Sequence, residues 1–125
     1  MKILSVDPSI VNIGVAILDD RKLLKSYTFR TNAEDELAVR VKQISDHFSG
    51  YTDYFDIALI EYPGTFMRKG QYAIKNVKSV QLLMLSIGVI AGVMSQRCPV
   101  DMVGVNDWKG RSGKSQTKLI VKSLC

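Results

Sequence analysis

The feature that most constrains the fold of this chain is an unbroken apolar run at residues 57–60, which stands between Asp56 and Glu61. A strand with one face in water alternates apolar and polar residues, whereas a strand buried on both faces is apolar throughout. A segment with helical periodicity precedes the run. Its apolar residues share one helical face: Leu37, Val41, Ile44 and Phe48. A helix that leads into a doubly buried strand indicates an α/β fold with a parallel strand pair.

Three strands are predicted before that helix, at residues 2–7, 13–19 and 23–29. Short polar turns separate them, so we expect an antiparallel meander. Thr31 or Asn32 is expected to cap the helix, with the acidic cluster 34–36 in its first turn, and Gly50 is expected to end it.

Further elements follow the apolar run. Pro63 and Gly64 break the chain, and a long helix is predicted from about Gln71 to Gln96. A strand at residues 100–105 and a last helix from near Ser115 complete the order β-β-β-α-β-α-β-α. The pattern predicts an α/β fold whose five-stranded mixed sheet has three antiparallel strands, then two parallel strands, flanked by helices.

The length and charge of the chain indicate its class. With 125 residues and no linker, we expect a single domain, residues 1–125. Seventeen Lys and Arg residues outnumber twelve Asp and Glu residues, giving a net charge of +5. This balance suits a nucleic acid, with simple solubility as the other interpretation.

Nothing in the sequence indicates a membrane or secreted protein. The apolar stretch Leu82–Met94 is shorter than a bilayer requires, so a buried helix is expected there. The chain opens directly into a strand, with no signal peptide. Cys98 and Cys125 have no spacing typical of a metal cluster or a disulfide framework, which predicts reduced thiols in the cytoplasm.

Two carboxylates are predicted at the ends of strands, Asp7 on the first and Glu61 on the fourth. If these strands are parallel neighbours, both side chains emerge at one edge of the sheet. Converging carboxylates repel each other unless a cation lies between them, and oxygen ligands suit Mg²⁺ or Mn²⁺. Such a site can hydrolyse phosphodiesters. For either acid alone, the competing interpretation is a residue that merely ends a strand.

Four segments resemble the RuvC-type Holliday junction resolvases, in the same order. They are residues 3–9 followed by 14–17, then 56–61, then 66–69, and finally Trp108-Lys109-Gly110 with Lys114-Ser115-Gln116. The resemblance implies an RNase H-like fold and a homodimer that nicks four-way DNA junctions symmetrically, using Mg²⁺ for which Mn²⁺ can substitute.

The resemblance also implies roles for individual residues. Asp7 and Glu61 would be metal ligands, and Lys109 and Lys114 would stabilise charge near the scissile phosphate. Aromatic and basic residues would contact DNA: Tyr62, Phe66, Arg68, Lys69, Lys75, Lys78, Trp108 and Arg111. For the cluster Arg68, Lys69, Lys75 and Lys78, a solvated surface is an equally good interpretation.

Two positions depart from the family pattern. Ser9 stands where the family commonly has Gly. The family also completes its site with one or two acids on a helix near the C-terminus, and this sequence stops at Cys125, where that segment would begin. The chain is either a truncated form or a divergent one, and Asp107 is a candidate substitute for the missing acids.

Other functions stay open. The chain can be a junction-binding domain that does not cut, or a YqgF-like nuclease that acts on RNA. A sugar kinase or actin-like ATPase needs a second domain, for which 125 residues leave no room. The apolar second half of the long helix, with Gly88 and Gly92, favours a symmetric dimer.

Overall fold

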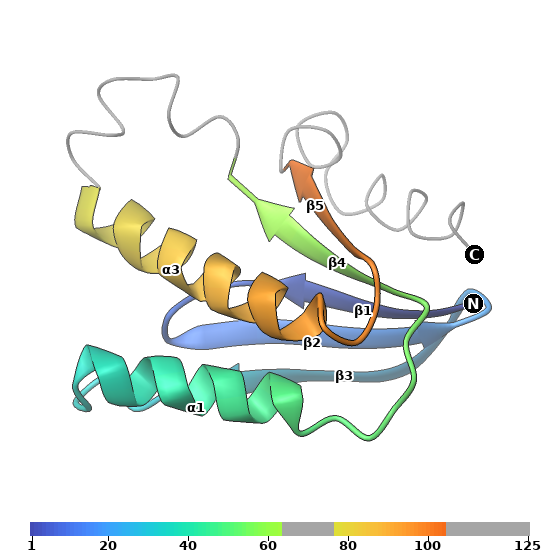
Figure 1. Ribbon diagram of the computed structural model, residues 1–125, viewed down its shortest axis with the longest axis horizontal. Coiled ribbons are helices and arrows are strands. Elements are labelled where there is room, and N and C mark those ends of the chain that lie inside the picture. The colour runs from blue at the N-terminus through green and yellow to red at the C-terminus, as the bar shows by residue number, and fades with distance from the viewer. Residues whose placement is uncertain (64–76, 105–125) are drawn as a thin grey trace.

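A five-stranded mixed sheet organises the computed structural model of the chain (Figure 1), which describes residues 1–63 and 77–104. The strands lie in the order β3-β2-β1-β4-β5. Their bounds are β1 Lys2–Asp7, β2 Asn12–Asp19, β3 Lys22–Arg30, β4 Ile57–Tyr62 and β5 Val100–Gly104. β1, β2 and β3 pair antiparallel, whereas β4 pairs parallel with both β1 and β5. The predicted fold class is therefore confirmed.

One face of the sheet carries the main core. Both described helices, α1 (Leu37–Ser49) and α3 (Val77–Met94), pack there. The sheet contributes Leu4, Val6, Ile13, Val15, Ile17, Ala58 and Ile60. The helices contribute Ile44, Phe48, Ile87, Ile90, Ala91 and Met94. The opposite face holds a smaller cluster around Ile3 and Leu59, both essentially buried.

The start of α1 differs from the expectation. Glu36 is the N-cap residue and makes no side-chain cap hydrogen bond, and the first turn holds no acidic residue. Asn32 is occupied elsewhere, because its Oδ1 accepts from the backbone N–H of Glu34. The Thr31 hydroxyl donates to the carbonyl of Ile10. Thr31 therefore stabilises the loop between β1 and β2, and Asn32 stabilises the turn before the helix, while Gly50 is the C-cap as predicted.

Helix α3 is buried on one side only. Its buried residues are Ser86, Ile87, Ile90, Ala91 and Met94. By length and composition alone, this 18-residue helix could cross a membrane, and it is the one such helix among residues 1–63 and 77–104. Because its buried side packs into the same core as α1, we interpret it as a core helix with a second, outward surface.

His47 lies in an aromatic cluster between β3 and α1, a setting that sequence reasoning missed. Its ring stacks on Phe29 at a centroid distance of 4.1 Å, and its Nε2 lies 2.8 Å from the hydroxyl of Tyr27. Tyr27 also shares a hydrogen bond with the hydroxyl of Tyr51. The cluster fixes the edge strand β3 to α1.

Truncation of Phe48 tests the core. The Phe48 side chain is fully buried, and Phe48→Ala should lower the free energy of unfolding by about 3–5 kcal/mol through lost burial and the cavity left behind. The matched control is Leu37→Ala on the same helix. Leu37 belongs to the predicted apolar face but is 42% exposed, so the change should be within about 0.5 kcal/mol. Urea denaturation measures both, and equal losses would contradict the packing of α1.

The half-buried imidazole of His47 makes stability depend on pH. Burial, together with the charge of Lys25, lowers the pKa of His47 below its ordinary value. As the pH falls through about 6.5, the unfolded chain takes up a proton that the folded chain does not, so the free energy of unfolding decreases. His47 is the only histidine. The urea midpoint should therefore fall between pH about 7 and about 5.5, and His47→Phe should remove most of this slope. An unchanged slope in the variant would disprove the assignment.

Candidate functional site

Asp7 and Glu61 lie beside each other on neighbouring parallel strands. The β1–β4 register pairs Ser5 with Leu59 and Val6 with Ile60, so its next step brings Asp7 next to Glu61. Parallel neighbours are about 4.8 Å apart. Since side chains alternate along a strand, Asp7 shares a face with Ile3, and Glu61 shares that face with Leu59. Both carboxylates therefore lie on the face opposite α1 and α3.

The surroundings of Asp7 leave room at its side chain. Asp7 is exposed at the end of β1, and Glu61 is half-buried. Gly14 of β2 pairs with Asp7, and a Cβ atom at position 14 would lie 3.4 Å from the Cβ of Asp7. A bulkier side chain there would crowd the carboxylate, so glycine keeps the approach to it open.

An open hollow of about 480 Å³ adjoins Asp7 over β1, β2 and β3. Its lining is Ser5, Asp7, Gly14, Val15, Ala16, Ser26, Tyr27 and Thr28. Most of these lining side chains are small or carry a hydroxyl group. They leave space, and supply hydrogen-bonding groups, next to the carboxylate of Asp7.

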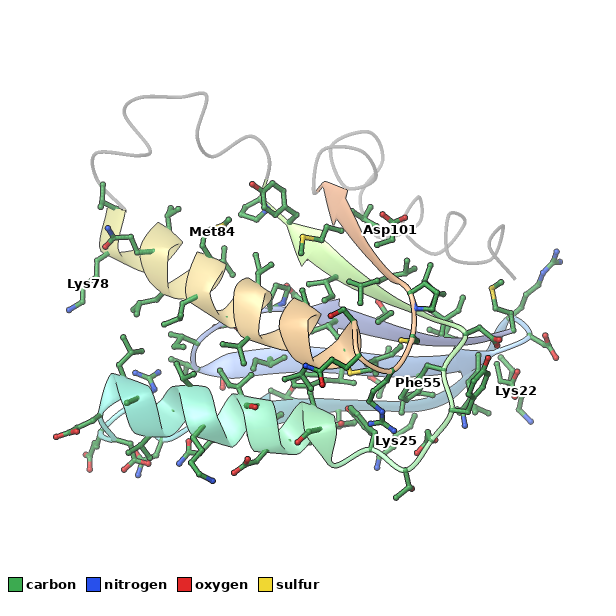
Figure 2. All side chains as sticks on the ribbon, viewed as in Figure 1. Lys22, Lys25, Phe55, Lys78, Met84 and Asp101 are labelled. Atoms are coloured by element: carbon green, nitrogen blue, oxygen red, sulfur yellow. The ribbon has the colours of Figure 1, made fainter. Side chains whose placement is uncertain are left out.

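The remaining predicted site residues fall into two groups. Tyr62 directly follows Glu61, so its half-exposed side chain faces the other side of the sheet. Lys78 is exposed in the first turn of α3, which begins at the end toward which β4 runs (Figures 1 and 2). The others lie outside the described residues: Phe66, Arg68, Lys69, Lys75, Asp107, Trp108, Lys109, Arg111 and Lys114.

The described carboxylates fit a hard divalent cation. Mg²⁺ keeps several waters and is commonly bound by one or two carboxylates together with substrate phosphates. Asp7 and Glu61 supply such a set. Asp101 also faces this side but pairs with Leu59, two residues before Glu61. Within residues 1–63 and 77–104, no group of three His, Cys, Asp or Glu residues could hold a metal ion.

Two residues that contact the loop after Asp7 escaped sequence reasoning. Ser86 of α3 and Arg40 of α1 donate hydrogen bonds to the carbonyl groups of Ser9 and Ile10. The one available signal was a serine within the apolar half of α3. Its partner depends on the tertiary fold and could not be read from the sequence.

Comparison with known proteins identifies the fold. No protein-family model matches the sequence, and no curated protein does. Thermus thermophilus RuvC in complex with a Holliday junction substrate is similar, with a TM-score of 0.74 at 18% identity over 99% of this chain and 78% of that chain. A second Thermus thermophilus RuvC structure has a TM-score of 0.71 at 18% identity over 98% and 79%.

At this identity the similarity concerns the fold. It agrees with the strand order and pairing described above and with the resemblance seen in the sequence motifs. The chain has the fold of the RuvC Holliday junction resolvases.

Proposed function

We propose that the chain is a structure-selective endonuclease that resolves four-way DNA junctions by metal-dependent phosphodiester hydrolysis. The observation that carries this proposal is the placement of Asp7 beside Glu61, at the carboxyl edge of the β1–β4 pair, in a RuvC fold. One of the similar RuvC structures holds a Holliday junction substrate, which supports branched DNA as the substrate class. The net charge of +5 suits a polyanion.

In this proposal Asp7 and Glu61 hold Mg²⁺, or Mn²⁺ in its place. The bound cation supplies Lewis-acid activation of the phosphate and of the attacking water. The protein's own contribution is to fix two oxygen ligands on adjacent strands and to keep the space beside Asp7 open through Gly14. The hollow next to Asp7 gives the substrate backbone access to that carboxylate.

Basic residues complete the proposed site. Lys109 and Lys114 stabilise charge at the scissile phosphate, as cations placed at a developing charge do. The other DNA-contacting residues are Tyr62, Phe66, Arg68, Lys69, Lys75, Lys78, Trp108 and Arg111. We assign this function to one domain, residues 1–125, acting in the cytoplasm of a bacterial or phage-infected cell.

Paired nicks need two active sites, and α3 provides a surface for a second copy. Its outward side exposes Val77, Met84 and Leu85. Side chains added at Gly88 or Gly92 would meet open space. Because glycine has no side chain, a partner could approach the helix backbone closely at these two positions. Figure 2 shows Met84 on the side of α3 away from α1. We propose that this outward surface forms the symmetric contact of a homodimer.

The specific alternative is a domain that binds junctions without cutting them. The described residues place two acids at the sheet edge and not three. A site with two carboxylates holds Mg²⁺ weakly, because this ion gives up its water reluctantly. Cleavage and binding must therefore be measured on the same samples.

The first test compares cleavage of a labelled four-way junction with that of a matched linear duplex, in Mg²⁺ or Mn²⁺. We expect paired nicks in the junction. Asp7→Asn and Glu61→Gln should each lower the nicking rate at least about 100-fold, because each removes a charged ligand of the cation that activates the phosphate and the water. Asp101→Asn is the matched control, since Asp101 is an exposed acid on the same face but pairs with Leu59, two residues before Glu61.

Three other outcomes would change the conclusion. Tight junction binding without nicks would establish the binding domain. Cleavage of RNA in preference to the junction would favour a YqgF-like nuclease. No preference for the junction over the duplex would disprove the resolvase assignment.

The dimer is tested by charging the outward side of α3. Leu85 is 38% exposed, and Leu85→Lys should weaken self-association at least about tenfold because it buries an unpaired charge in the contact. Analytical ultracentrifugation gives the dissociation constant. Leu37→Lys, at a similarly exposed leucine on α1, should leave the dissociation constant unchanged. A Leu85→Lys protein that dimerises like the parent would place the contact elsewhere.

A further inference from the structure

The loop that joins β1 to β2 begins directly after Asp7 and is organised by Ser9. The Oγ of Ser9 accepts hydrogen bonds from the backbone N–H groups of Val11, at 3.2 Å, and Asn12, at 3.4 Å. The carbonyl groups of Ser9 and Ile10 take their hydrogen bonds from side chains outside the loop. The position of this loop therefore depends on distant parts of the chain.

Helix α3 holds the first of these carbonyls. The Oγ of Ser86 donates to the carbonyl of Ser9 at 2.7 Å, across 77 residues of sequence. Ser86 is fully buried although it lies in the apolar half of α3. A serine inside a helix usually returns its hydroxyl to the preceding turn of the same helix. Here the bond ties α3 to the loop, and its loss would leave a carbonyl without this partner.

The second carbonyl is held from the end of β3, through Thr31, and from α1, through Arg40. Ile10 accepts from the Oγ1 of Thr31 at 2.5 Å and from Nη2 of Arg40 at 3.1 Å. The Nε of Arg40 also donates to that hydroxyl at 3.2 Å. With Ser86 removed, this support would still hold Ile10, so the loop should shift locally at Ser9 and not unfold.

Pro8 connects this support to the carboxylate. Pro8 is buried between Asp7 and Ser9, and its ring fixes its own φ while restricting the backbone of the residue before it. Fewer backbone torsions between Ser9 and Asp7 are therefore free to absorb a displacement at Ser9.

We propose that Ser86 is a positioning residue for Asp7, which it fixes against Glu61 through the carbonyl of Ser9. This inference rests on the proposed function, because it takes Asp7 as a metal ligand. Removing a group that orients a metal ligand typically weakens metal binding or activity about 10–100-fold. Ser86→Ala should therefore act on the metal and not on the binding of DNA.

The test titrates the full chain with Mn²⁺ and follows the paramagnetic broadening of backbone amide signals near Asp7, with Asp7→Asn as the background. Ser86→Ala should raise the half-saturating Mn²⁺ concentration about tenfold. Ser86→Thr keeps the hydroxyl and should restore it to within about twofold of the parent. Ser79→Ala, an exposed serine on the same helix, is the matched control. Junction affinity should be unchanged in all three variants.

Each contrary outcome has a distinct meaning. If the parent binds Mn²⁺ at Asp7 and Ser86→Ala binds it equally well, the positioning role is overturned and the proposed function stands. If Ser86→Ala lowers the thermal midpoint but leaves the half-saturating Mn²⁺ concentration unchanged, Ser86 has only a structural role, and the positioning role is overturned as well. If the parent shows no broadening beyond that of Asp7→Asn, the proposed function fails and the positioning role fails with it.

Discussion

The parallel pairing of β1 with β4 is the constraint on which the rest of the structure depends. It fixes the register Val6 to Ile60, so the next residues of the two strands stand side by side at the edge of the sheet. A shift by one residue would turn one carboxylate into the main core, where an unpaired charge is costly. Burial of Val6 and Ile60 under the helices thus maintains the geometry of the site.

The main core and the candidate site lie on opposite faces of the sheet. α1 and α3 cover one face with large apolar side chains, whereas the other carries Asp7, Gly14 and the small side chains of the hollow. Small side chains bury little apolar area and so contribute little to stability. The face with the hollow can stay open over β1, β2 and β3 because the face under the helices supplies most of the apolar burial. The small cluster of Ile3 and Leu59 adds apolar burial on the second face, and Val103, which packs against it, pairs with Glu61.

Much of this arrangement was predictable from the sequence. The apolar run at residues 57–60 and the three short strands before α1 determine the mixed sheet and bring Asp7 and Glu61 to one edge. The predicted capping residues of α1 were wrong, because Thr31 bonds to the β1–β2 loop and Asn32 bonds within the turn before the helix. The roles of His47 and Ser86 depend on partners far away in sequence. Side-chain periodicity along a single element carries no information about such partners.

Consecutive residues of α3 point to different surroundings, and this connects the proposed dimer contact to the candidate site. Leu85 is exposed on the outward side, and Ser86, the next residue, is buried against the loop after Asp7. A helix moves as a rigid element, so a partner that fixes the outward side also fixes the hydroxyl that holds the carbonyl of Ser9. In the proposed homodimer, the contact between copies would therefore restrict the position of Asp7 in each. If Asp7 is held in the same position in both copies, the two sites would bind the cation with equal affinity. Symmetric nicking requires two such equivalent sites.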